Sequence, residues 1–468
     1  MNIPRVFSFS IFLFLLSTFA FLISPSAFPQ GGSLTPPGAP APTMKTLDQV
    51  QPRTLIPAGT AVYTISSEGS YYLGGNLSIA SGNAITVNAN NVTIDLQGFE
   101  VIGTGGSAGI FLNGGVSNVT IRNGTIRNFT SDGINGQGNS TVRVEKVRAL
   151  NNAGSGIVVD LNGAVIDCAA EANGAVGIVG TDNCVIQHCQ SIGNTGANSH
   201  GIAVANAAQI SGCVARNNAG SGIVTGTDST LSACVATNNT TGGISVGDSC
   251  TILNSTANQN GMNGGTTAGS HGIAAAGAFT ITNCTGNKNT GDGLSVSGGS
   301  PGATVHNSTF NGNTLNGIDA SIGSVVTACI TNNNGGQGIN AQLGCRVQDC
   351  TADLNAGNGI VLLGVCRAID NDCRQNSAAG ILAQTAGGSR IEGNNVVVNI
   401  NQGIMVTTTN CLIIRNSARA NFAVNYSIVA GNRYGPIVDI TAGGTAAVSG
   451  SSAADTTTTT HPWANFSY

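Results

Sequence analysis

The sequence predicts an all-β solenoid of about 14–15 turns, built from short parallel strands. Three observations predict it. A Gly-Ile dipeptide, once Gly-Leu, recurs along most of the chain, apolar residues alternate with period two inside each repeat, and an Asn occupies one fixed offset in ten repeats. No repeat offers the roughly ten residues of period 3.6 that a helix needs, so a helical fold is excluded.

The repeat sets the length of one turn. Most steps between successive repeat glycines are 21 residues, several are 23 or 24, and one is 29. A unit that tolerates insertions at one place is expected to stack on its neighbours as one coil of a solenoid. These glycines are at positions 109, 133, 156, 177, 201, 222, 243, 272, 293, 317, 338, 359, 380 and 403.

Columns counted from the repeat Ile predict the strands. Position +2 is often Val, +8 is Val, Ile or Leu, +11 is Cys in seven repeats, and +13 is mostly Ala or Ser. The pairs 0/+2 and +11/+13 have the period of a strand, so each unit holds two or three short strands joined by turns. All units run in the same direction, so equivalent residues should stack in parallel at about 4.8 Å per turn.

The asparagine column lies five positions before the Ile, at residues 152, 173, 218, 239, 289, 313, 334, 355, 376 and 399. A carboxamide has two donors and an acceptor, so it can bond the amides one turn above and below. We interpret the column as an internal ladder at a bend. The alternative is that Asn merely favours turns, but this preference does not require one fixed offset in ten units.

The repeated N-x-x-x-x-G-I-x-V, followed by V/I-x-x-C-x-A, resembles the repeats of the pectin-lyase-like superfamily over roughly residues 81–430. The segments NVTIDLQGFEVIG and HPWANF are similar to those of exported bacterial β-helix proteins without an assigned reaction. The resemblance implies a single-stranded right-handed parallel β-helix. It implies no single reaction, because the superfamily includes pectate lyases, polygalacturonases, alginate epimerases, phage tailspikes and adhesins.

The ends of the chain differ from the repeats. Arg5 precedes an apolar stretch from Val6 to Ile23, which predicts a signal peptide over residues 1–27 and a secreted or cell-surface protein. An uncleaved membrane anchor is the alternative, disfavoured by Ser and Thr interruptions. We expect a Pro/Gly-rich linker at 28–43, an N-terminal cap region at 44–80, the β-helix at 81–440, and a low-complexity tail at 441–468 that holds a candidate C-terminal cap.

The charge balance and hydropathy of the chain restrict the classes of binding partner. The chain has 17 Lys+Arg against 21 Asp+Glu, so it lacks the basic surplus of a nucleic-acid-binding protein. Beyond the signal segment no stretch predicts membrane insertion.

The 13 Cys of an exported chain suggest disulfides. However, stacked parallel Cβ atoms lie about 4.8 Å apart rather than the usual 3.5–4.5 Å, so we expect buried free thiols. Cys184, His188 and Cys189 do not predict a metal site, because adjacent residues of a strand point to opposite faces. We expect neither a metal nor a cofactor.

One polar column suggests catalysis. The position two residues before the Ile holds Asp132, His200, His271 and Asp292. His271 and Asp292 fall on adjacent turns, so the carboxylate is placed to orient the imidazole for acid–base chemistry. His271, Asp292 and His200 are therefore weak catalytic candidates. The alternative is a turn position that accepts any small polar side chain, since the same column holds Ser155, Ser221 and Asn316.

Two other groups suggest binding. The weak ligand-binding candidates are Arg346, Asp349, Arg367 and Asp370, which lie near Asp372 and Arg374 on two adjacent turns. They fit either a uronate or a solvated salt-bridge ladder. The acidic pairs Asp160/Asp182 and Asp228/Asp248 suggest calcium, but each pair supplies only two carboxylates.

The leading functional hypothesis is an exported β-helix that binds an extended polysaccharide on a lateral face. The alternatives are a polysaccharide lyase, epimerase or hydrolase that uses the His271/Asp292 region, and a purely structural surface protein or adhesin. The sequence leaves open whether the protein is an enzyme. One Trp, six Tyr and 14 Phe leave few aromatic platforms for stacking against sugars.

Overall fold

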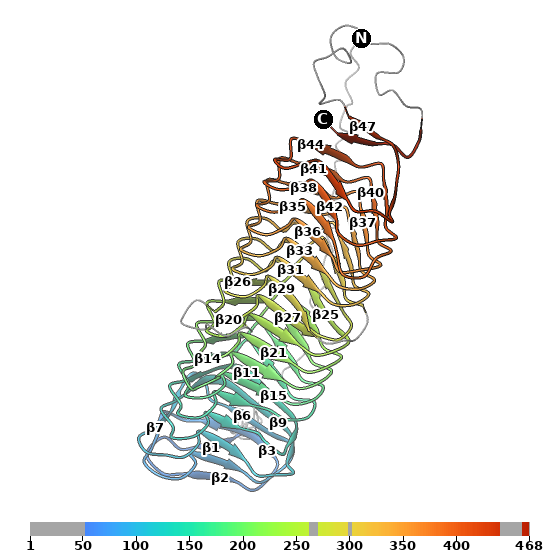
Figure 1. Ribbon diagram of the computed structural model, residues 1–468. Coiled ribbons are helices and arrows are strands. Elements are labelled where there is room, and N and C mark those ends of the chain that lie inside the picture. The colour runs from blue at the N-terminus through green and yellow to red at the C-terminus, as the bar shows by residue number, and fades with distance from the viewer. Residues whose placement is uncertain (1–51, 262–269, 298–301, 440–460, 468) are drawn as a thin grey trace, which may run out of the picture. The chain divides into compact units, whose positions relative to one another are not determined.

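The computed structural model describes residues 52–261, 270–297, 302–439 and 461–467. Within these ranges the chain forms strands and turns only, and every strand pair is parallel. The coil has about 16 turns (Figure 1). It is longer than the Gly-Ile repeat predicts because Tyr63, Ile85 and Tyr426 occupy the register of the repeat Ile without a preceding Gly.

Most coils contribute one strand to each of three stacked sheets, and the coils at Thr285, Thr309 and Ile330 carry only an isolated bridge in the third. Sheet 1 carries the repeat Ile and consists of β2 (Tyr63–Ile65), β5 (Ile85–Val87), β8 (Ile110–Leu112), β10 (Ile134–Asn135), β12 (Ile157–Val158), β15 (Ile178–Gly180), β18 (Ile202–Val204), β21 (Ile223–Thr225), β24 (Ile244–Val246), β27 (Ile273–Ala276), β29 (Leu294–Ser297), β31 (Ile318–Ala320), β33 (Ile339–Ala341), β36 (Ile360–Leu362), β39 (Ile381–Ala383), β42 (Ile404–Val406) and β45 (Tyr426–Ile428).

Sheet 2 follows sheet 1 in each coil. It consists of β1 (Thr54–Ile56), β3 (Gly69–Leu73), β6 (Val92–Asp95), β9 (Ser117–Arg127), β11 (Ser140–Leu150), β13 (Ala164–Ile166), β16 (Val185–Gln187), β19 (Gln209–Ser211), β22 (Thr230–Ser232), β25 (Cys250–Leu253), β28 (Phe279–Thr282), β30 (Thr304–His306), β32 (Val325–Thr327), β34 (Arg346–Gln348), β37 (Arg367–Ile369), β40 (Arg390–Glu392), β43 (Leu412–Ile414) and β46 (Arg433–Tyr434).

Sheet 3 closes the coil, and the long strands β9 and β11 run through both sheets 2 and 3. Its other strands are β4 (Leu77–Ile79), β7 (Glu100–Gly103), β14 (Ala169–Glu171), β17 (Gln190–Ile192), β20 (Val214–Arg216), β23 (Val235–Thr237), β26 (Thr256–Asn258), β35 (Thr351–Asp353), β38 (Asp372–Arg374), β41 (Asn395–Val397), β44 (Ser417–Arg419), β47 (Ile437–Asp439) and β48 (Asn465–Ser467).

The core consists of the columns that the period-two pattern predicts. In one coil Ile223, Leu231, Cys234 and Ala236 are each 0% exposed. Ile223 pairs in register with Ile244 of the next coil. Side chains therefore stack on equivalent side chains along the axis, and the outward residues between them form surface columns.

The repeat glycine is required by the asparagine ladder. A Cβ placed on Gly222 would lie 2.6 Å from Nδ2 of Asn239 and 2.8 Å from the carbonyl oxygen of Gly243. Backbone and ladder therefore approach too closely for any side chain. Asn218 donates from Nδ2 to Oδ1 of Asn239 over 3.0 Å, so the predicted ladder is confirmed.

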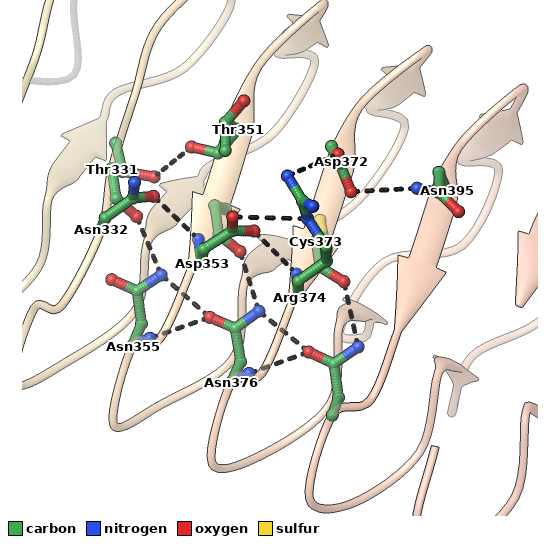
Figure 2. Close-up of polar contacts among 12 residues, drawn as sticks. Thr331, Asn332, Thr351, Asp353, Asn355, Asp372, Cys373, Arg374, Asn376 and Asn395 are labelled. Atoms are coloured by element: carbon green, nitrogen blue, oxygen red, sulfur yellow. Dashed lines mark hydrogen bonds and ion pairs between the residues drawn. The ribbon is translucent and has the colours of Figure 1, made fainter. Parts of the chain in front are cut away.

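The ladder has members that the fixed offset missed. Asn194 and Asn260 also belong to it, because in their coils the inserted residues lie between the Asn and the repeat Gly. Both asparagines are found by counting forward along the chain instead: Asn194 lies five residues after Cys189, and Asn260 lies five residues after Ser255. Figure 2 shows ladder members Asn355 and Asn376, whose side chains are joined by a hydrogen bond of 2.9 Å.

A second ladder occurs where the +11 cysteines end. Asn371, Asn394 and Asn416 donate in turn to the next amide over 2.9–3.1 Å, and the last acceptor is Oδ1 of Asn465. Asn465 begins β48, which lies in parallel between β44 and β47. The segment 461–467 thus stacks on the last coils.

At the other end, parallel stacking begins with β1, inside the segment 44–80 that we assigned to an N-terminal cap region. Asp95 links these first coils, because it forms ion pairs of 2.8 Å with Arg53 and 3.2 Å with Arg122. Burial alone would raise the pKa of Asp95, but hydrogen bonds from Asn123, the Gln97 backbone and Arg53 and the charge of Arg122 outweigh it and lower that pKa.

The expected signal peptide (1–27), the linker (28–43) and residues 441–460 of the tail lie outside the described residues. In the part of the chain that is described, no helix is long and apolar enough to span a bilayer.

Candidate ligand-binding site

The column before sheet 1 ties successive coils together. Asp132 accepts a hydrogen bond from the backbone N–H of Ser155 over 2.7 Å, and His200 accepts one from Ser221 over 3.0 Å. His271 does the same for Asp292 over 3.1 Å. Every one of these contacts joins a side chain to the backbone of the next coil, as a purely structural turn position requires. Burial also lowers the pKa of His200.

His271 and Asp292 lie together as their adjacent turns predict. Nδ1 of His271 is 3.2 Å from Oδ2 of Asp292, and the two side chains are 14% and 6% exposed. Because Nδ1 accepts a backbone N–H, the neutral imidazole carries its proton on Nε2.

Asp319, on β31, joins this neighbourhood. Burial raises its pKa, the Asp292 charge raises it further, and His271 opposes the shift. The carboxylate accepts a hydrogen bond of 2.8 Å from Asn340. Sequence reasoning missed Asp319 because its outward column holds Ala and Ser in the preceding coils.

An outward column of arginines runs along the last part of sheet 2, and we call it the arginine column. It consists of Arg346 on β34, Arg367 on β37, Arg390 on β40 and Arg433 on β46, with Leu412 between the last two. Arg390 pairs with Glu392 at 2.6 Å, and Arg346 donates to Gln348. Arg367 and Arg433 form no ion pair within the described ranges.

The two aspartates that the sequence placed with these arginines lie elsewhere. Asp349 and Asp370 occupy exposed turn positions with φ of 52° and 54°, and neither forms an ion pair with Arg346 or Arg367. The ion pairs of this region belong to Arg374, which is 3.0 Å from Asp372 and 3.5 Å from Asp353 on sheet 3 (Figure 2). Arg346 and Arg367 therefore have no carboxylate partner among the described residues.

In the acidic pairs Asp160/Asp182 and Asp228/Asp248, carboxylates accept hydrogen bonds from backbone N–H groups. Asp160 accepts hydrogen bonds from the N–H groups of Gly138 and Leu161, at 2.7 and 2.9 Å. Asp248 accepts from Ser249 and Ala278, at 2.8 and 2.6 Å. In the described ranges no group of three His, Cys, Asp or Glu side chains is arranged to hold a metal ion.

All 13 cysteines are free and buried. Burial raises the pKa of Cys234 to about 12. The Cys234 thiol therefore carries almost no thiolate at neutral pH. Because every cysteine is buried, the stacked thiols pack in the core as small apolar side chains.

A cavity of about 400 Å³ lies at the C-terminal end of the arginine column. We call it the terminal pocket, and it is lined by Arg390, Leu412, Ile414, Arg433, Tyr434, Gly435, His461 and Trp463. Sequence reasoning noticed the single Trp but not its neighbours, because its segment is separated from the coil by the low-complexity tail.

Comparison with solved structures finds β-helices of low similarity. The Azotobacter vinelandii mannuronan C-5 epimerase AlgE6 A-module is 11% identical, with 82% of this chain and 91% of that chain covered and a TM-score of 0.23. The Dettilon tailspike protein (gp208) is 14% identical, with 76% and 61% covered and a TM-score of 0.35. Pectate lyase Pel9A is 14% identical, with 56% and 71% covered and a TM-score of 0.24.

No curated protein sequence matches the chain significantly. The family model of the right-handed β-helix region matches residues 63–209, 226–372 and 271–418, which together span more than half of the chain. The repeat, the parallel coil and this match agree, and the chain therefore belongs to the family of right-handed β-helix proteins.

Proposed function

We propose that this protein binds an extended polysaccharide along the outward face of sheet 2. The observation that carries the proposal is the arginine column, in which Arg346, Arg367 and Arg390 occupy three successive coils. Guanidinium groups bind carboxylate and sulfate groups in a bidentate manner. A cation repeated at a constant spacing of about 4.8 Å suits a ligand that itself repeats an acidic group.

Export is part of the proposal, because a secreted or cell-surface location brings the column into contact with extracellular polymers. The net charge of the whole chain is −4, so attraction of an acidic polymer must be local to the column. Because exposed charges are screened by salt, binding should weaken as the ionic strength rises.

Retention on immobilised polygalacturonate, alginate and neutral glucan tests the proposal. We expect retention on an acidic polymer at low salt and elution at about 0.5 M NaCl. The double variant Arg346→Gln/Arg367→Gln should weaken binding about 100-fold or more, since it removes two charge-assisted contacts of about 1.5–3 kcal/mol each. The matched control is Arg216→Gln, which removes an exposed arginine from sheet 3. Equal retention of the double variant and the control would refute the assignment of the column.

A second candidate function is enzymatic modification of the polymer near His271. The raised pKa of Asp319 beside the His271–Asp292 pair favours it, because acid–base catalysis separates the pKa values of neighbouring groups. This function predicts new chain ends or altered sugar units, lost in His271→Ala and Asp292→Asn but retained in His188→Ala, which removes an exposed imidazole. A structural surface protein predicts neither turnover nor retention.

A further inference from the structure

The terminal pocket combines two segments far apart in the sequence. Arg390, Leu412 and Arg433 are the last outward residues of the arginine column, and Tyr434 follows Arg433 on β46. The lining is completed by His461 and Trp463, from the segment that leads into β48.

The C-terminal segment is held firmly enough to form a preorganised wall. Asn465 donates from Nδ2 to the carbonyl oxygens of Ile413 at 3.2 Å and Gly435 at 3.0 Å. A Cβ on Gly435 would lie 1.8 Å from the carbonyl oxygen of Trp463, so only glycine permits this approach.

Charge and surface chemistry of the pocket indicate the ligand class. Glu392 forms ion pairs with both Arg390 and Arg415, at 2.6 and 3.3 Å. Two arginines thus share one carboxylate, and Arg433 forms no ion pair with any described residue. Arg415 also stacks 4.2 Å from the centre of the Trp463 ring. An anionic group is therefore favoured in the pocket.

The pocket also offers apolar area for a ring. Tyr434 is 55% and Trp463 41% exposed, while Leu412 and Ile414 complete the apolar part of the lining. Large aromatic surfaces next to an arginine without an ion pair, Arg433, suit a ligand that has a flat, partly apolar face and an acidic substituent. A single acidic sugar unit has both features.

Resting on the proposed function, we infer that the terminal pocket binds one acidic sugar unit at the end of the polysaccharide chain. The acidic group contacts Arg433, and the ring lies against Trp463 and Tyr434. Continuity with the arginine column favours the end of an acidic polymer over a free nucleotide, which also carries a ring and an anion. The pocket thereby fixes the end of a chain whose remainder follows the column.

The single Trp of the protein reports on this pocket directly. We expect trigalacturonate to change Trp463 fluorescence in a saturable way, whereas neutral cellotriose and sodium acetate of equal ionic strength leave it unchanged. Arg433→Gln should weaken this binding about tenfold or more, and Arg216→Gln should not. No saturable change with trigalacturonate, an equal response to ATP, or an unchanged affinity of Arg433→Gln would overturn the inference.

Two further measurements separate the pocket from the arginine column. If polygalacturonate retains the protein but trigalacturonate does not affect Trp463, the inference fails and the proposed function stands. If neither ligand binds, both fail. Trp463→Ala replaces a side chain that is not buried, so β48 should keep its hydrogen-exchange protection while trigalacturonate affinity falls; retained affinity in this variant, measured by calorimetry, would also overturn the inference.

Discussion

Replacing Asn239 with Ala tests the asparagine ladder at a member whose amide is fully bonded on both sides. Asn239 is 0% exposed. Its Oδ1 accepts from the backbone N–H and the Nδ2 of Asn218, at 3.1 and 3.0 Å, and its Nδ2 donates to Ala215 and Asn260, both at 3.1 Å. The variant therefore leaves two buried N–H donors of Asn218 without their acceptor.

The expected cost follows from those two donors. A buried polar group that loses its partner costs about 1–3 kcal/mol, so Asn239→Ala should destabilise the surrounding coils by about 2–6 kcal/mol. The adjacent Asn238 provides a matched control. It is exposed and has a φ of 55°, which glycine adopts without strain, so Asn238→Gly should change stability by less than about 1 kcal/mol.

Hydrogen exchange is the appropriate assay, because a solenoid is stabilised by contacts between neighbouring coils and need not unfold in one step. Asn239→Ala should lower the protection of β21 and β24 by about 30-fold or more while β3 and β6 keep theirs. Equal protection in Asn239→Ala and Asn238→Gly would refute the claim that the ladder stabilises the coil.

The other predictions concern pH, thiols and the C-terminal cap. The lowered pKa of Asp95 stabilises the fold above its ordinary value of 3.8, so thermal melts of Asp95→Asn should show a loss of stability at neutral pH that disappears as the pH falls through the folded-state pKa. The raised pKa of Asp319 has the opposite sign: Asp319→Asn should be more stable than the parent at neutral pH, and the gain should vanish below pH 3.8. Iodoacetamide should label none of the 13 buried thiols, Cys234 included, until guanidinium unfolds the protein, as mass spectrometry will show. Asn465→Ala removes hydrogen bonds to Ile413 and Gly435 and should abolish exchange protection in β48 while β36 stays protected.

Repetition explains why so much of the fold was predictable. Ile223 and Ile244 meet the same neighbours one coil apart, so one offset in the sequence specifies one position in every coil. The ladder was predictable for the same reason. The prediction omitted Asn194 and Asn260, because insertions change their offset from the repeat Ile but not their position in the coil.

The candidate sites were predictable only in part. The adjacency of His271 and Asp292 follows from the repeat, whereas the contribution of Asp319 depends on burial by side chains that the repeat does not specify. Likewise, the stacking of Arg346 on Arg367 follows from the register, but only the tertiary structure shows that Asp349 and Asp370 leave these arginines without an ion pair.

The sequence by itself determined the parallel coil, its core columns and its asparagine ladder, because each depends on contacts between neighbouring units of one repeating pattern. Only the tertiary structure decided that Trp463 lies beside Arg390 and Arg433 and that Asn465 ends the second ladder. Those contacts join a non-repeating segment to the last coils, so they depend on where the chain returns in space and not on any period in the sequence.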